Sequence, residues 1–80
     1  MQDEEILSKI TELTDEEHNL ESSHHERELS EAELARLEAI RVSLDQCWDL
    51  LRQRRARRHA GLDPDDAHVR PASTVEGYEQ

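Results

Sequence analysis

Apolar residues recur in this chain at spacings of three and four, which is the repeat of one face of an α-helix. This spacing limits the fold more than any other feature of the sequence. A first stretch, from Asp3 to about Ser23, has its apolar positions at Ile6, Ile10, Leu13 and Leu20. A second stretch has them at Leu37, Ile40, Leu44, Cys47 and Leu51. The pattern predicts two amphipathic helices, each with one apolar seam.

Short motifs mark the ends of these helices. Ser30 and Glu33 match a capping box, in which the hydroxyl accepts from the Glu33 amide and the carboxylate accepts from the Ser30 amide. Asp3 is the expected N-cap of the first helix. Gly61 is the expected residue of left-handed conformation just after the second helix.

Two helices with a short connection predict an all-α fold, an antiparallel hairpin in which helix 2 is longer than helix 1. The first helix is expected over about residues 3–23, the connection within 22–29 and the second helix over about 31–60. Residues near 25 and 30 then face each other across the turn, so Asp3 is expected beside residues 50–52. This register sets an acidic helix start next to a basic helix end.

Residues 61–80 differ in composition from the predicted hairpin. They hold both Pro and both Gly of the chain, and beyond residue 66 their sizeable apolar side chains are only Val69, Val75 and Tyr78. Asp63 and Pro64 can open a single helical turn, with Asp63 as the cap. The composition is typical of a flexible acidic C-terminal tail.

Composition excludes several classes of protein. Two Gly and two Pro in 80 residues argue against small barrels and sandwiches, which need many tight turns. A single Cys cannot form an internal disulfide, which excludes a disulfide-stapled secreted scaffold. The acidic N-terminus lacks the apolar segment of a signal peptide, and no apolar run approaches membrane-spanning length. We therefore expect a soluble, cytoplasmic protein that makes no membrane contact.

One hairpin of this size has too little apolar surface to be stable alone, because each apolar stripe keeps one side in water. We therefore predict a homodimer, most simply a two-fold pair of hairpins that forms a four-helix bundle. The residues expected to contact the second copy, or another protein, are Leu37, Ile40, Leu44, Trp48, Leu51, Arg54, Arg55 and Arg58.

Positive charge is concentrated in one block of an acidic chain. The net charge is −10, yet residues 52–59 carry Arg52, Arg54, Arg55, Arg57 and Arg58. These side chains lie on more than one helix face, and three kinds of group can neutralise their positive charge. The candidates are a partner helix, an external anion, and the acidic tail with Asp63, Asp65 and Asp66.

The block Arg52–Arg58 favours a protein partner, and accessory nucleic-acid binding is the first alternative function. Arginine side chains supply the phosphate contacts that nucleic-acid binding needs. The acidic net charge and the lack of an aromatic stacking residue near the block disfavour that alternative.

A metal-binding helical bundle is the second alternative, with Glu17, Glu21 and His24 as its weak candidate ligands. Glu21 and His24 form a Glu-x-x-His pair, which di-iron bundles combine with single Glu residues on facing helices. The second helix offers apolar residues where bridging carboxylates are needed, so we expect no metal or other cofactor. Glu17 occupies a seam position, where an ion pair with Arg41 of the facing helix is predicted.

The sequence contains no pattern that predicts catalysis. Cys47 lies on the apolar face beside Trp48, where a thiol packs as a small hydrophobic group and Trp48 acts as a core or interface anchor. There is no Gly-rich phosphate loop, no Ser/His/Asp triad pattern and no paired-cysteine metal motif. We expect a non-enzymatic protein, without catalytic residues, that acts through self-association and contacts with other proteins.

One segment is distinctive enough to suggest a family. The run Cys-Trp-Asp-Leu-Leu-Arg-Gln-Arg-Arg at residues 47–55, with Asp-Glu-Glu-His at 15–18 and Val-Glu-Gly-Tyr-Glu-Gln at 75–80, resembles a family of small, uncharacterised actinobacterial proteins defined as a domain of unknown function. The resemblance covers essentially the whole chain and assigns no catalytic residue. It implies that residues 61–80 belong to the same structural unit as the hairpin.

Overall fold

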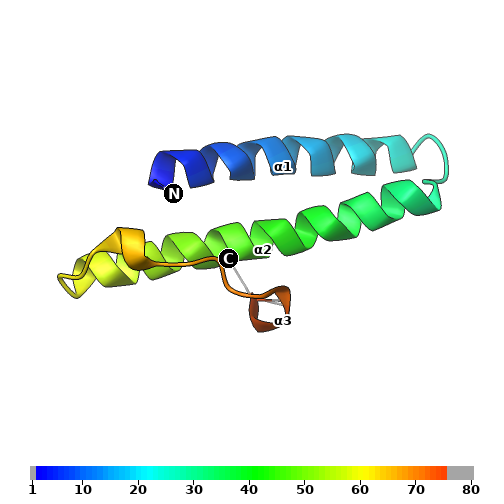
Figure 1. Ribbon diagram of the computed structural model, residues 1–80. Helices are drawn as coiled ribbons and strands as arrows, with labels where there is room; N and C mark the ends of the chain where they lie inside the picture. Colours follow the sequence, from blue (N-terminus) through cyan, green and yellow to red (C-terminus); the bar gives the residue numbers. More distant parts are fainter. Residues whose placement is uncertain (1, 76–80) are drawn as a thin grey trace.

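The computed structural model describes residues 2–75, which form two long antiparallel helices and a C-terminal segment that runs back along the second helix (Figure 1). Helix α1 spans Asp3–His24, and helix α2 spans Glu31–His59. A 3₁₀ turn, η1, spans Pro64–Asp66, and a short helix, α3, spans Ala72–Val75. The predicted all-α hairpin with a longer second helix is confirmed, whereas its pairing into a four-helix bundle stays a prediction.

The capping box at the start of α2 is confirmed. The Ser30 hydroxyl accepts from the Glu33 N–H at 3.1 Å, and the Glu33 carboxylate accepts from the Ser30 N–H at 2.9 Å. The Arg27 guanidinium donates to the same carboxylate at 2.7 and 2.8 Å. These bonds, led by the one from Arg27, lower the pKa of Glu33 to about 2, so the cap stays ionised over most of the pH range.

The end of α2 also follows the sequence. Gly61 adopts a positive φ of 75°, which an L side chain rarely tolerates. The N–H groups of Gly61 and Leu62 then donate to the carbonyls of Arg58 and Arg57 at 3.1 and 2.8 Å. This Schellman arrangement closes the helix and turns the chain back along α2.

The start of α1 corrects one prediction. The N-cap is Gln2, and Asp3 is the first residue of the helix. The Gln2 N–H donates to the Glu5 carboxylate at 3.0 Å, which gives this end its own capping contact. The Asp3 carboxylate is engaged elsewhere, by Arg54 and Arg58 near the far end of α2. Asp3 therefore pairs with residues 54 and 58, which follow the predicted stretch 50–52.

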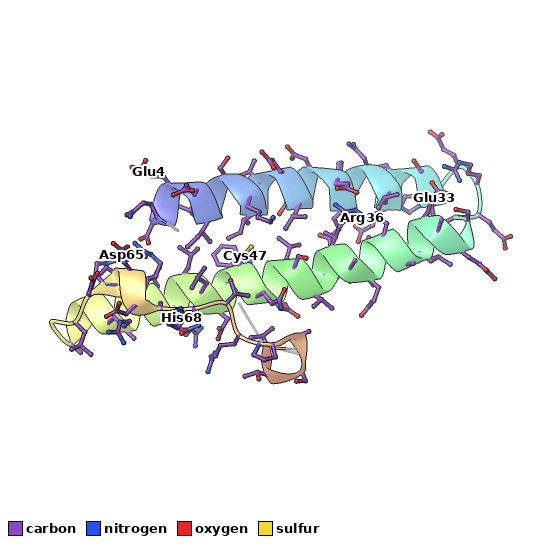
Figure 2. The ribbon with its side chains drawn as sticks, viewed as in Figure 1. Glu4, Glu33, Arg36, Cys47, Asp65 and His68 are labelled. Carbon is purple, nitrogen blue, oxygen red and sulfur yellow. The ribbon has the colours of Figure 1, made fainter. Side chains whose placement is uncertain are left out.

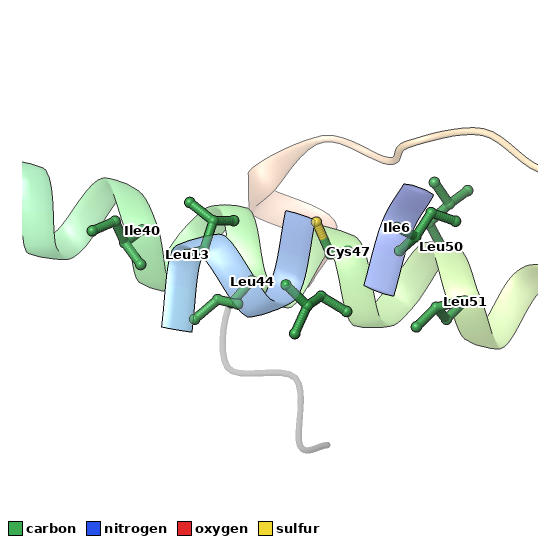
Figure 3. Close-up of a cluster of buried hydrophobic side chains, with 8 residues drawn as sticks. Ile6, Leu13, Ile40, Leu44, Cys47, Leu50 and Leu51 are labelled. Atoms are coloured by element: carbon green, nitrogen blue, oxygen red, sulfur yellow. The ribbon is translucent and has the colours of Figure 1, made fainter. Parts of the chain in front are cut away.

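The core is the apolar seam between α1 and α2. Figure 3 shows the α1 residues Ile6 and Leu13 gathered with side chains of α2. Ile6 and Ile40 are fully buried, and Leu20, Trp48 and Ala67 pack on the edge of the cluster. The buried members of the cluster are Ile6, Ile10, Leu13, Ile40, Leu44, Cys47, Leu50 and Leu51.

Residues 63–75, called the strap from here on, pack along α2. Figure 1 shows α3 on the side of α2 that faces away from α1. The predicted turn at Asp63 is present, because its side chain accepts from the Asp65 N–H at 2.9 Å. Val75 is fully buried, and both η1 and α3 contact α2. The expectation of a flexible tail is therefore wrong for residues 61–75, while Tyr78 lies outside the described residues.

The helices differ from those that cross a lipid bilayer, which need about 20 predominantly apolar residues in a row. Within residues 2–75, no helix combines the length and the apolar character that a membrane span needs.

Ile40→Ala should lower the free energy of unfolding by about 3 kcal/mol, because it opens a cavity at a fully buried position of the seam. Urea denaturation followed by circular dichroism measures this change. Val69→Ala is the matched control, since Val69 is 58% exposed and its truncation should change stability by less than about 0.5 kcal/mol. Equal effects of the two substitutions would contradict the assigned core.

Candidate functional site

Helix α2 is the central element, and its three sides have different neighbours. Residues at spacings of three, four or seven share one side of a helix. One side, with Ile40, Leu44 and Leu51, packs on α1. A second side, with Gln46, Asp49 and Gln53, holds the strap. No second element of the described residues 2–75 covers the third side, which is called the uncovered side from here on. It carries Leu34, Glu38, Arg41, Asp45, Trp48, Arg52, Arg55 and His59.

Arg54 joins the first helix, the second helix and the strap. Its side chain is only 4% exposed. Its guanidinium donates to the Asp3 carboxylate at 2.5 Å, to the Asp65 carboxylate at 3.0 Å and to the Pro64 carbonyl at 3.1 Å. A buried guanidinium needs such partners, because an unpaired charge is strongly disfavoured away from water. Arg54 therefore ties together three segments that are far apart in the sequence.

Arg57 and Arg58 add to this connection. Arg58 donates to the Asp3 carboxylate at 2.7 Å, and together with Arg54 it lowers the pKa of Asp3. Arg57 donates to the Asp63 carbonyl at 2.5 Å and to the Asp66 carboxylate at 3.3 Å. Figure 2 shows Asp65 at the end of the hairpin where α1 begins. Among the three candidates for matching the basic block, the acidic C-terminal segment is the one seen in the fold.

Asp49 anchors the middle of the strap. The Asp49 side chain is 1% exposed. Its Oδ2 atom accepts from Arg70 Nε at 2.8 Å and from Gln53 Nε2 at 2.9 Å. Its Oδ1 atom accepts from Arg70 Nη2. Gln53 also donates to the His68 carbonyl at 2.7 Å, and Gln46 donates to the Arg70 carbonyl at 3.2 Å. The bond from Arg70 is the main cause that lowers the pKa of Asp49.

Sequence reasoning missed this anchor. Gln46, Asp49 and Gln53 repeat at spacings of three and four, which places polar groups along one side of a helix that is otherwise charged. A polar stripe of this kind can hold extended backbone through side-chain amides and a carboxylate. The stripe was therefore a usable signal for a packed segment, although it does not identify Arg70 as the partner.

The basic block is divided between structure and surface. Arg54, Arg57 and Arg58 form ion pairs with acidic residues of the fold. Arg55 is exposed and makes no ion pair with the described residues 2–75. Arg52 is also exposed, and it contributes to lowering the pKa of Asp49. The block therefore does not present a continuous basic surface of five arginines to a nucleic acid.

The uncovered side of α2 borders two grooves against α1. One groove lies over Leu44 and Trp48, with Thr14 and Glu17 as its α1 wall. The next lies over Leu34 and Leu37, with Glu21 as part of its α1 wall, and the two grooves share Arg41. Further along α2, Arg52, Arg55 and Ala56 border a shallow depression.

Apolar groups are exposed along the same surface. Leu34 is 51% exposed, and Trp48 is half-buried. Leu7 is 48% exposed and precedes Thr14 by seven residues, so both lie on one side of α1. Exposed apolar side chains on one side of a helix are typical of a contact surface.

Most apolar residues that we predicted at an interface are buried inside the single chain. Their exposed fractions are 7% for Leu37, 0% for Ile40, 6% for Leu44 and 7% for Leu51. Arg54 is likewise enclosed by its ion pairs. Of the predicted interface residues, the uncovered side therefore offers Trp48 and Arg55.

Two of the residues considered as metal ligands, Glu17 and Glu21, form ion pairs with an arginine. Arg41 lies 3.8 Å from the Glu17 carboxylate and 3.6 Å from that of Glu21, so the predicted Glu17–Arg41 pair is present. His24 shares a groove with Glu21. Within residues 2–75, no group of three His, Cys, Asp or Glu side chains is placed to hold a metal ion.

Cys47 packs in the core, as expected. Figure 2 shows its side chain between α1 and α2, and it is 8% exposed. Burial raises the pKa of the thiol, with Lys9 acting weakly in the opposite sense. A thiol that is enclosed and protonated is a poor nucleophile.

Arg54→Lys should loosen both ends that Arg54 joins, because an ammonium group cannot reproduce the guanidinium fork toward Asp3, Asp65 and the Pro64 carbonyl. We expect faster amide hydrogen exchange in residues 3–6 and 63–67. Arg55→Lys is the matched control, since Arg55 is exposed and should leave exchange unchanged. Equal protection in both variants would contradict the assigned role of Arg54.

Asp49→Asn should lower the free energy of unfolding at neutral pH by about 1 kcal/mol, because the Arg70 guanidinium loses its charged acceptor. Arg70 is 46% exposed, so hydrogen bonds to water replace part of the lost interaction. The folded pKa of Asp49 lies below its ordinary value of 3.8. Its stabilisation is therefore complete above that value and is lost as the pH falls through the folded pKa.

Urea denaturation at several pH values measures the effect of Asp49→Asn. The difference between wild type and variant should shrink in acid. Asp15→Asn is the control, since Asp15 is exposed and makes no ion pair within residues 2–75. A difference that stays constant down to the lowest pH would contradict a charge-dependent anchor.

Comparisons with known proteins give this fold a family. The family model described as "Protein of unknown function (DUF2630)" matches residues 2–80. The relatives include the uncharacterized proteins Mb0922c of Mycobacterium bovis and Rv0898c of Mycobacterium tuberculosis. Each is 51% identical over 77 residues, which cover 95% of this chain and 88% of the relative. No solved structure matches the chain. The expected resemblance to an uncharacterised actinobacterial family is confirmed, and the chain belongs to the DUF2630 family.

Proposed function

We propose that this chain is a non-enzymatic helical-hairpin protein that acts through self-association and contacts with other proteins. The observation that carries the proposal is the uncovered side of α2. The first helix takes one side of α2, and the strap takes a second side over the C-terminal half, while the third side keeps Leu34 and Trp48 accessible. Apolar side chains of this size on a small protein are stabilised when a partner removes them from water.

The acidic residues with a lowered pKa use their charge to hold the fold together. The residues whose carboxyl pKa is lowered are Asp3, Glu16, Glu33 and Asp49. Each accepts hydrogen bonds from an arginine that joins two segments of the fold. Catalytic acids and bases instead lie where a substrate can approach them and have pKa values near the working pH. These four carboxylates therefore hold the fold together, and the proposal of a non-enzymatic protein assigns them no chemical step.

Two hairpins that meet through the uncovered side bring four long helices together. In this arrangement α2 of each copy lies near the centre and α1 lies outside. The four-helix form of the assembly is part of the proposal. It differs from the arrangement expected from sequence, because the contacts come from Trp48 and its neighbours rather than from the buried seam.

Sedimentation equilibrium of the full chain at micromolar concentration should give a mass near twice the 9.3 kDa of one copy. The reason is that association removes Trp48 from water. Trp48 is the single tryptophan of the chain, so its fluorescence reports the same event without a substitution. Its emission should shift to longer wavelength on dilution.

The control for this measurement is far-ultraviolet circular dichroism over the same dilution, which should stay constant if only association changes. A helical species of 9.3 kDa at every concentration, with constant emission, would contradict self-association.

A further inference from the structure

The uncovered side of α2 has a regular pattern of its own. Starting at Leu34, its positions follow at alternating spacings of four and three, which is the repeat of a helix-pairing seam. The residues at these positions are Leu34, Glu38, Arg41, Asp45, Trp48, Arg52, Arg55 and His59. A seam with this repeat is suited to packing against another long helix.

The charges along this seam are ordered from one end to the other. Glu38, Arg41 and Asp45 lie on the N-terminal side of Trp48, and Arg41 is paired with Glu17 and Glu21 of α1. Arg52 and Arg55 lie on the C-terminal side. Asp45 and Arg55 make no ion pair with any residue of the described range 2–75. They are ten residues apart, which is about 15 Å along a helix, so they cannot pair with each other.

A second α2 that runs antiparallel satisfies both groups at once. We place the two-fold axis level with residue 50. A residue that lies before residue 50 in one copy then faces the residue that lies equally far after residue 50 in the second copy. Asp45 then lies level with Arg55 of the second copy, with Arg52 of that copy one turn away, and the contact occurs twice. Trp48 lies near the axis, over the arginine stems of the second copy, where aromatic rings and guanidinium groups attract each other.

A second copy fits this seam better than the other occupants. A parallel helix pair would place Asp45 against Asp45 and Arg55 against Arg55, which is repulsive. A nucleic acid would meet Asp45, Glu38 and a chain of net charge −10, while Arg54, Arg57 and Arg58 are held by the fold. An isologous contact needs one surface that is complementary to itself, and on this seam Asp45 and Arg55 lie on opposite sides of Trp48 with opposite charges.

We propose that two copies of the chain pair through the uncovered sides of their α2 helices, antiparallel, with Asp45 of each copy against the Arg52 and Arg55 side chains of the other. This inference rests on the proposed self-association and specifies its surface and direction. It also assigns Leu7 a place beside the contact, since Leu7 lies on the side of α1 that flanks the seam.

A charge exchange tests the pairing. Asp45→Arg sets two positive side chains against each other, because the new guanidinium lies near Arg55 of the second copy. Arg55→Asp sets two negative side chains against each other, because the new carboxylate lies near Asp45 of the second copy. Each variant alone therefore carries the repulsion twice. We expect the dimer of each variant to be at least about tenfold weaker than that of the wild type. Sedimentation equilibrium measures the dissociation constant.

Mixing the two variants is the decisive measurement. In a mixed dimer, the guanidinium introduced by Asp45→Arg in one chain meets the carboxylate introduced by Arg55→Asp in the other. The unchanged Arg55 of the first chain meets the unchanged Asp45 of the second, so both contacts are again between opposite charges. An equimolar mixture should associate about as tightly as the wild type, whereas each variant alone should not. Native mass spectrometry of one isotope-labelled variant identifies the mixed dimer directly.

Glu12→Arg is the matched control. Glu12 is exposed on α1 with Glu4 and Ser8 and lies away from the seam, so this charge reversal should leave the dissociation constant unchanged. Circular dichroism confirms that the variants keep their helices.

The outcomes that contradict the proposal are distinguishable. A wild-type dimer that persists equally in both single variants would overturn this surface while leaving self-association intact. Two weakened variants that do not associate on mixing would overturn the antiparallel direction. A wild-type chain that is monomeric throughout would overturn the proposed self-association, and this inference with it.

Discussion

The fold depends on the burial of one guanidinium group. Arg54 is almost completely enclosed, and removing a charge from water is strongly unfavourable unless its hydrogen bonds are replaced. The replacements come from Asp3, 51 residues earlier, and from Pro64 and Asp65, which follow the end of α2. Arg54 therefore links the start of α1, which also packs in the core through Ile6, to the strap. Only the complete arrangement satisfies the charge.

The rest of the structure follows from the way a long helix distributes its neighbours. Consecutive residues of α2 are rotated by about 100°, so a helix of 29 residues offers several parallel stripes along its length. The apolar stripe packs on α1, and the amide-and-carboxylate stripe binds the strap through Asp49, Gln46 and Gln53. A two-helix hairpin alone would leave that polar stripe in water. The strap covers it and also buries Val75, so it enlarges a core that is small for a free-standing domain.

Local signals predicted the helices well, and long-range charge pairing was harder to predict. The periodicity placed both helices, and the capping box at Ser30 and the turn at Gly61 are set by short-range hydrogen bonding. Asp3 was predicted as a cap because aspartate commonly occupies that position. Its carboxylate instead binds two arginines, which depends on the register between α1 and α2. The strap was mistaken for a tail because its anchors lie mostly in its backbone carbonyls and in Arg70, and composition does not report those contacts.

The arginine block shows most clearly why spacing matters more than composition. Five arginines within seven positions suggest a basic patch, yet the helical rotation separates them. Arg54 and Arg58 point toward α1 and bind Asp3, and Arg57 reaches the strap. Arg52 and Arg55 fall on the uncovered side with Trp48 and Asp45. The first three groups hold the hairpin closed, which fixes the direction of α2 relative to its neighbours. The order of acidic and basic residues along the uncovered side is set by the sequence of α2, and the proposed antiparallel pairing depends on that order.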